Sequence, residues 1–403
     1  MRDHFLDYPL GGSVLTILIG VVIISALLQG KRLPKSKLYL TWLLFGVYLY
    51  CSLWLGTVVR NAPAPLWLSD VNFVTWKDYM LIPLLFVAAS LVIEDRKSVR
   101  MIVILTGVSL FLVDKSTLLE SLSRNWSSFD ESKRDAGPLA YGSNQLAAFL
   151  AQFGMFFWGF VVFMKRKKVK LICYGLVGAT LLATMYTFSR GAYAAVLASV
   201  LVLAILKDRK LLILWVVFLF TWQIIMPPAV TERVDMTTNA NGTLEASAQE
   251  RVDLWEQSRN MFFQDPIFGN GFATFQLGDH VADLTDTHNW YVKVLVETGI
   301  IGGAFAFALL LQMILAGFSL FRKSQDSLYR GLGLGFLLAV CSCIVANLFG
   351  DRWTYLEITG LIWILAAAVL RAQQLERESA SATETVAEEQ PRSLAAGPWA
   401  AIR

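Results

Sequence analysis

The sequence predicts an all-α protein whose helices form a bundle across a membrane, and three observations support this prediction. The chain has 403 residues, 56% of them hydrophobic, and its mean hydropathy of +0.53 exceeds what soluble domains usually reach. Its apolar residues form blocks close to the roughly 20 residues that cross a bilayer. Clusters of basic residues occupy every second connection between blocks. A polytopic membrane protein with about eleven or twelve transmembrane helices is therefore expected.

Eleven apolar blocks follow one another along the chain, and each predicts one helix. Several are shorter than a full span, so a count of twelve stays open. The blocks lie near residues 10–29, 38–58, 77–93, 100–114, 141–164, 168–187, 191–206, 210–226, 292–321, 329–348 and 354–370.

The basic connections indicate how the chain is oriented. They hold 18 of the 35 lysines and arginines and lie at residues 31–37, 94–100, 165–170, 207–210 and 321–330. Basic loops stay on the cytoplasmic side, which predicts an outer N-terminus and a cytoplasmic C-terminus. The basic residues thus fit a protein whose partner is the lipid bilayer, and no nucleic-acid partner is expected.

Four regions follow from this pattern. Residues 1–226 form the N-terminal transmembrane helices, 227–291 a large loop on the outer side of the membrane, 292–370 the C-terminal helices, and 371–403 a polar tail expected to be disordered in the cytoplasm. The loop is far longer than ordinary connections, which makes it the expected place for function.

The large loop has its own order along the sequence. It opens with a polar stretch that lacks periodicity. An amphipathic helix is predicted over residues 248–263, and the turn QDPIFGNG (264–271) should end it.

Three arginines are candidate anion-binding groups, since a guanidinium matches the charge and fork geometry of phosphate. Arg190 stands in TFSRGAY (187–193), where two apolar helices meet. An arginine at membrane depth needs a partner or a wet cavity, although it can also snorkel to the interface. The neighbouring Gly191 permits close backbone approach. Arg251, on the amphipathic helix, and Arg352, in GDRW, could equally lie on solvated faces.

His288 is the candidate general base, in the stretch THNWYVKVLVETGIIG (287–302). Asp286, Thr287 and Asn289 can cap a helix that begins near Trp290. The positive end of a helix dipole disfavours imidazolium, so the ring should be neutral near pH 7 and able to accept a proton. A histidine that only fills a polar niche is the alternative. Another helix with capping residues is expected to start at Gly142-Ser143-Asn144.

Other kinds of site find little support. The cluster Asp279, His280, Asp283, Asp286 and His288 matches no metal-ligand spacing, so no metal is expected. No nucleotide- or dinucleotide-binding motif and no zinc-protease or hydrolase motif is present, so no cofactor is expected.

The predicted spans offer little for proton-coupled transport. Glu297 is their one acidic candidate, and it can pair with Lys293 at helical i, i+4 spacing.

The chain resembles the O-antigen ligase and O-antigen polymerase superfamily of bacterial envelopes. The resemblance spans most of the chain and includes SRG at an outer helix junction, ERVDLW and DPIFGNGFATF in one late loop, and a histidine opening the next span. The ligase branch is marked by His, then Asn, Ser or Gln, nine residues, Gly, two residues, and Gly, Thr or Tyr. Here His288 and Asn289 are followed at that spacing by Gly299 and Gly302.

The resemblance implies an inner-membrane glycosyltransferase with a GT-C-like helical fold. It would transfer O-antigen glycan en bloc from undecaprenyl diphosphate to lipid A–core in the periplasm, with inversion and without metal. The resemblance assigns His288 as base and Arg190 and Arg251 as diphosphate clamp. Asn289, Asn144 and Arg352 are possible supporting residues from their places in the sequence.

Alternatives remain within and outside this enzyme class. A polymerase of repeat units or a protein O-oligosaccharyltransferase would belong to the same superfamily. A lipid-linked glycan flippase or exporter would instead show broken helices and polar groups at mid-membrane.

Overall fold

The computed structural model describes residues 14–67, 70–121, 127–130, 134, 138, 142–236, 246–277 and 286–393. These residues form thirteen α-helices and two short 3-10 helices, and this described part contains no strand. The predicted all-α fold of a polytopic membrane protein is confirmed.

Eleven of the helices coincide one by one with the predicted apolar blocks. They are α2 (Val14–Leu28), α3 (Lys37–Arg60), α4 (Val71–Val92), α5 (Arg96–Ser121), α6 (Ser143–Val161), α7 (Lys167–Tyr186), α8 (Arg190–Leu206), α9 (Arg209–Ile225), α12 (Trp290–Lys323), α13 (Ser327–Ala346) and α14 (Leu356–Ser393).

By length and composition, fewer than these eleven helices are suited to cross the membrane. Seven described helices are long and apolar enough, and the pair α9 and α10 (Pro228–Asp235), bent by 104°, could add an eighth. Helices α2 and α8 are apolar but shorter. The chain is therefore multi-pass, whereas the total of eleven or twelve spans stays a prediction.

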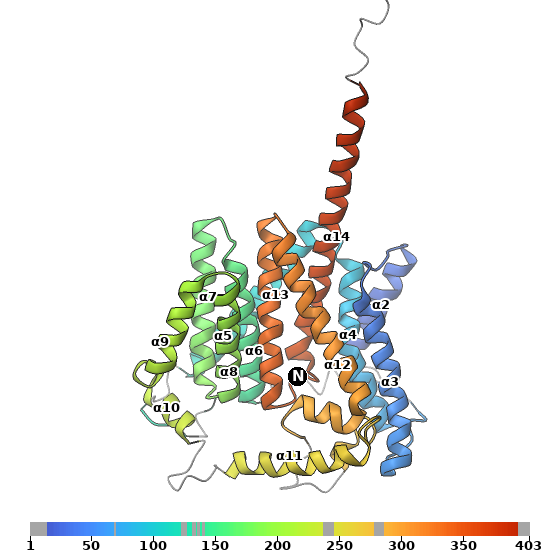
Figure 1. The fold of residues 1–403 in the computed structure, drawn as a ribbon, viewed down its shortest axis with the longest axis vertical. Helices are drawn as coiled ribbons and strands as arrows, with labels where there is room; N and C mark the ends of the chain where they lie inside the picture. Colours follow the sequence, from blue (N-terminus) through green and yellow to red (C-terminus); the bar gives the residue numbers. More distant parts are fainter. Residues whose placement is uncertain are drawn as a thin grey trace, which may run out of the picture.

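Helix α13 is the centre of the bundle and packs against α6, α8 and α12 (Figure 1). Glycines allow these close approaches. A Cβ atom at Gly159 of α6 would lie 2.9 Å from the backbone of Gly335 in α13, and one at Gly331 would lie 2.8 Å from the Phe160 carbonyl oxygen. Small residues let membrane helices associate by backbone contact, where lipid leaves little hydrophobic driving force.

The basic connections gather at one end of the bundle. Lys31 pairs with Glu94 at 3.0 Å, and Arg96 pairs with Asp326 at 2.8 Å, so three separate connections meet there. Helix α11 (Ala246–Gln264) lies across the opposite end (Figure 1). This arrangement matches the grouping of basic connections expected from the sequence.

The segment after Arg371 differs from its expected disorder, because α14 continues to Ser393. The Arg371 side chain donates to the Ile93 carbonyl oxygen at 2.6 Å, Leu375 packs against the core, and Glu376 accepts from Ser324 Oγ at 2.5 Å. Alanine, glutamine, leucine and glutamate are strong helix formers, and they extend a helix that the preceding span has already nucleated.

Helix α12 is broken at Gly299, which has φ 61° and ψ −166°. The break exposes backbone groups to the turn that follows α11. Asn270 N donates to the Val296 carbonyl oxygen at 2.9 Å, and Ile300 N donates to the Pro266 carbonyl oxygen at 2.9 Å. The turn is thereby fixed to the bundle by backbone hydrogen bonds.

Replacing Gly299 by alanine should destabilise the protein. A Cβ atom there would collide with the Ile267 carbonyl and lie 2.7 Å from Gly269 N, in a backbone conformation that costs a non-glycine residue about 1–3 kcal/mol. We expect a lower melting temperature for Gly299→Ala in detergent solution. Gly178→Ala in α7 is the control, because no atom lies within 4 Å of the added Cβ. Equal melting temperatures for the two variants would contradict this account.

Candidate functional site

A cavity of about 1090 Å³ lies between α8, α9 and the segments at their α11 end. Its head carries five arginines, Arg134, Arg190, Arg233, Arg251 and Arg352. Its body is apolar and is lined by side chains of α6, α7, α8 and α9, among them Trp158, Met185, Val200, Trp215 and Phe218. The cavity therefore joins a cationic end to a long apolar end.

The turn between α7 and α8 places Arg190 at the head of the cavity. Phe188 has φ 51° and is buried, which makes the turn tight. Arg190 is the first residue of α8. A Cβ atom at Gly191 would lie 2.7 Å from Phe349 Cβ, so this glycine permits the close approach that the sequence suggests.

Asn144 connects two parts of the head. Its Oδ1 atom accepts hydrogen bonds from Arg134 Nη2 at 2.8 Å and from Ser189 Oγ at 2.9 Å. One amide oxygen at the start of α6 thus holds an arginine and the residue before Arg190. Asn144, expected as a supporting residue, lies in the head as a positioning group.

Arg134 and Arg233 are site residues that the sequence did not reveal. Arg134 lies in a polar loop without periodicity. Arg233 belongs to α10, which stands where the sequence predicts a polar stretch without periodicity; its guanidinium lies 4.7 Å from the Phe129 ring. The Pro227-Pro228 pair was an available signal, because Pro228 occupies the first position of α10, where proline is favoured.

Helix α11 confirms the predicted helix at residues 248–263 and carries Arg251 into the cavity. Trp255 Nε1, one turn later, donates to the Thr287 carbonyl oxygen at 2.9 Å. This bond fixes the helix that holds Arg251 to the segment that holds His288.

His288 lies beside the head of the cavity, although it is not one of the lining residues. It is half-buried and has φ 51°. The next residue caps α12, since Asn289 Oδ1 accepts from Tyr291 N at 3.0 Å and from Val292 N at 3.3 Å. The predicted helix start and its cap are therefore confirmed, with Asn289 as the capping residue.

Burial is the first cause that lowers the pKa of His288 below the ordinary histidine value. Asp286 opposes the shift, while the positive charges of Arg251 and Arg352 add to it. The imidazole is therefore neutral near pH 7, as the helix end suggested. The sequence suggested the helix dipole as the cause. In the structure, desolvation and the positive charges of Arg251 and Arg352 disfavour the imidazolium.

Arg352, for which the sequence suggested only a supporting role or a solvated position, is one of the arginines of the head. It is buried, and its backbone N donates to Asn347 Oδ1 at 3.0 Å. Gly350, at φ 154°, lies against its guanidinium. Arg190, Arg251 and Arg352, distant in sequence, thus line one head.

Two other expectations from the sequence concern the pair Lys293 and Glu297 and the cluster considered for metal. Lys293 forms its ion pair with Asp351 at 3.1 Å, while Glu297 accepts from Phe275 N at 3.2 Å. The charges of Lys293 and Glu297 still attract each other, but their contacts are mainly tertiary. Of the cluster considered for metal, Asp279, His280 and Asp283 lie outside the described residues.

The pKa of His288 should respond to its charged neighbours in opposite directions. Arg251→Gln removes a cation and should raise this pKa, whereas Asp286→Asn removes an anion and should lower it further. NMR titration of the imidazole measures both shifts, and His288→Gln assigns the signal among the three histidines. Shifts in the same direction would contradict this arrangement of charges.

Comparison with known proteins identifies the segment that contains these groups. Residues 175–307 match the family model described as O-antigen ligase. The matched segment runs from α7 into α12 and includes Arg190, Arg251, His288 and Asn289. No curated protein matches the chain. The chain is therefore a polytopic helical membrane protein in which residues 175–307 are similar to the O-antigen ligase family.

Proposed function

We propose that the protein is an inner-membrane O-antigen ligase. It would transfer a finished glycan from undecaprenyl diphosphate to a sugar hydroxyl of lipid A–core, on the periplasmic side. The observation that carries this proposal is the cavity that joins an arginine head to an apolar body. A lipid diphosphate has the same two parts, an anionic group and a long hydrocarbon chain.

The head suits a diphosphate because its cations come from separate, fixed segments. Arg190 begins α8, Arg233 lies on α10, Arg251 on α11 and Arg352 on the connection before α14. Guanidinium groups bind phosphate oxygens through paired hydrogen bonds. Cations placed in advance around a leaving diphosphate also stabilise the charge that develops as it departs.

The apolar body suits a polyprenyl chain that arrives from the bilayer. Helix α9 has no buried residue, so it forms a thin outer wall. Trp215 Nε1 donates to the Leu197 carbonyl oxygen at 2.9 Å and ties this wall to α8. The hydrocarbon would lie between α8 and α9 while the diphosphate meets the arginines.

In the proposed reaction, His288 accepts the proton of the acceptor hydroxyl. The acceptor oxygen then forms a bond to the anomeric carbon of the donor sugar, and the bond from that carbon to the diphosphate oxygen breaks. The electron pair leaves with undecaprenyl diphosphate, whose charge the arginines hold. Attack opposite the leaving group inverts the anomeric centre. The scheme invokes neither metal nor cofactor, because the diphosphate is the activated group.

The periplasmic location rests on the charge distribution. The basic connections meet at the end opposite α11, and basic loops remain cytoplasmic. The arginine head, at the α11 end, would then face the periplasm, where a finished glycan is available.

The closest alternative functions use the same donor. A polymerase would transfer the glycan to another lipid-linked glycan, and a protein O-oligosaccharyltransferase to a protein hydroxyl. A flippase or exporter would move the lipid without cleaving its diphosphate bond.

A deletion strain should separate these functions on a lipopolysaccharide gel. For a ligase, we expect loss of every band that carries O-antigen, because no glycan of any length reaches lipid A–core. Bands capped by a single repeat would identify a polymerase instead. An unchanged gel would overturn both and favour a protein acceptor. Loss of a flippase would also remove every O-antigen band, so glycan transfer by the purified protein is the measurement that separates a ligase from a flippase.

Variants of the candidate base and of a diphosphate-binding arginine should change different kinetic constants. His288→Ala should lower turnover about 10²–10⁴-fold, the usual contribution of a general base, with donor binding little changed. Arg190→Lys keeps the charge but loses the guanidinium fork, so it should weaken donor binding. Transfer rates against donor concentration, measured with purified protein, separate the two effects.

Arg209→Lys, an exposed substitution at the start of α9 and outside the cavity, is the matched control and should be silent. Wild-type rates in His288→Ala would remove the base from the scheme. Wild-type donor binding in Arg190→Lys would leave that arginine as an interfacial anchor only.

A further inference from the structure

A second cavity, of about 280 Å³, lies between α3, α4, α12 and the segment before α14. Its lining combines polar and aromatic side chains, among them Asp78, Lys293, Glu297, Asp351, Tyr79 and Trp290. None of the five arginines of the head lines it. It is thus separate from the proposed donor site.

The polar groups of this second cavity are held in fixed positions. Asp351 is 2% and Glu297 also 2% exposed. Lys293 Nζ lies 3.1 Å from Asp351 Oδ2, and Glu297 Oε1 accepts from Phe275 N at 3.2 Å. Burying ion pairs is often less stabilising than apolar packing in the same space. A rigid set of donors and acceptors around an empty volume is what recognition of a polar ligand requires.

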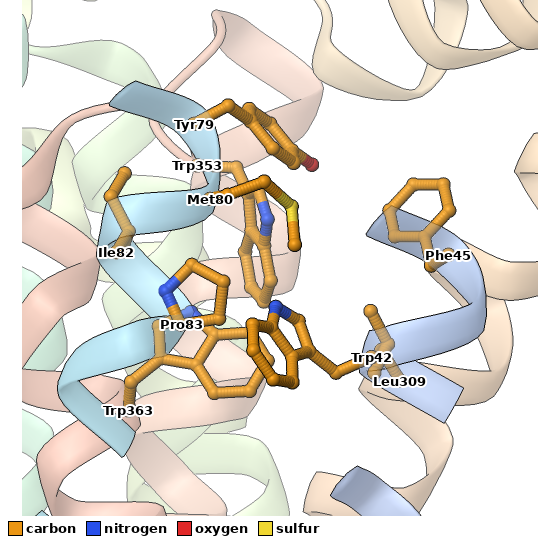
Figure 2. A pocket seen from close by; sticks show the side chains of 9 residues that line it. All are labelled: Trp42, Phe45, Tyr79, Met80, Ile82, Pro83, Leu309, Trp353 and Trp363. Atoms are coloured by element: carbon orange, nitrogen blue, oxygen red, sulfur yellow. The ribbon is translucent and has the colours of Figure 1, made fainter. Parts of the chain in front are cut away.

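The second cavity is closed towards the centre of the membrane. Figure 2 shows the smaller apolar gap that follows it along α4, where Trp42, Trp353 and Trp363 crowd around Pro83. Phe45 and Tyr79 line both spaces. The floor is therefore aromatic and tightly packed, and a ligand must approach from the end where Asp78, whose side chain is 60% exposed, and Gln276 lie.

The size of the cavity selects a small ligand. A cavity of about 280 Å³ has room for one sugar ring, and its open end leaves the rest of a longer glycan outside. Carboxylates and an ammonium can hydrogen-bond to ring hydroxyls, and an aromatic face packs against the apolar face of a sugar.

Two short segments border both cavities. In the first, Asp351 lines the second cavity while the next residue, Arg352, lines the arginine head. In the other, Trp290 lines the second cavity, and His288, two residues earlier, lies beside the head. The candidate base therefore stands where a ligand of one cavity would approach a ligand of the other.

We propose that the second cavity binds the terminal sugar ring of the acceptor glycan. This inference rests on the proposed transferase function and adds the position of its second substrate. The acceptor ring would lie among Lys293, Glu297 and Asp351, with one hydroxyl directed towards His288 where the two cavities border each other. A terminal sugar could belong to lipid A–core or to a second lipid-linked glycan, and the two acceptors are compared below.

The test fills the cavity without touching its buried charges. Thr75 on α4 lines the cavity, is half-buried, and its hydroxyl donates to the Val71 carbonyl oxygen within its own helix. Thr75→Phe should raise the KM for acceptor about tenfold or more, with kcat at saturating acceptor and the KM for donor little changed, because the acceptor binding that is lost is the same in the ground state and the transition state. Asp78→Asn at the rim should raise the acceptor KM in the same selective way, by less.

Thr57→Phe is the matched control. Thr57 on α3 is also half-buried, its hydroxyl donates to the Leu53 carbonyl oxygen within its own helix, and it lines neither cavity. Rates are measured with undecaprenyl-diphosphate-linked glycan as donor and, in separate arms, purified lipid A–core or a second lipid-linked glycan as acceptor.

Selective loss of acceptor affinity in one arm supports the proposal and names the acceptor. Wild-type acceptor KM in both Thr75→Phe and Asp78→Asn, or an equal change in Thr57→Phe, overturns it while the transferase function stands. A wild-type protein that transfers glycan to neither acceptor overturns the proposed function, and the acceptor site with it.

Discussion

The break in α12 at Gly299 is the constraint on which the rest of the α11 end depends. A continuous helix would satisfy its own backbone groups, and the turn after α11 would lose its backbone hydrogen bonds to α12. The left-handed conformation at Gly299 instead allows Val296 and Ile300 to bond with that turn. Together with the bond from Trp255 to Thr287, this joins α11 to the start of α12 at two points. Arg251 and His288 are thereby held on one framework.

The second constraint is the placement of several cations in one partly enclosed space. Like charges repel, and burial adds a desolvation penalty. The fold meets these demands locally. Asn144 Oδ1 accepts from Arg134, the Phe129 ring lies against Arg233, and Asn347 holds the backbone of Arg352. The positive charges of Arg251 and Arg352 add to burial, the larger cause, in lowering the pKa of His288.

Much of the fold could be predicted from the sequence, because apolar blocks and basic connections directly reflect the bilayer. The amphipathic helix and the cap at Asn289 were also readable from local pattern. Tertiary contacts were not. Nothing local shows that Lys293 turns to Asp351 instead of Glu297, or that Arg134 reaches Asn144. The helix after Arg371 was missed because composition alone does not reveal its contacts with Ile93 and Ser324.

Under the proposed function, the thin wall formed by α9 determines which concentration of the lipid donor governs occupancy of its site. A ligand that arrives through a wall facing lipid is drawn from the two-dimensional pool of the membrane, and its volume concentration in water has no bearing on occupancy. Occupancy then depends on the mole fraction of the ligand among lipids, so added detergent or lipid dilutes it at constant total amount. A crowded membrane leaflet, conversely, acts as a high effective concentration for a site of modest intrinsic affinity.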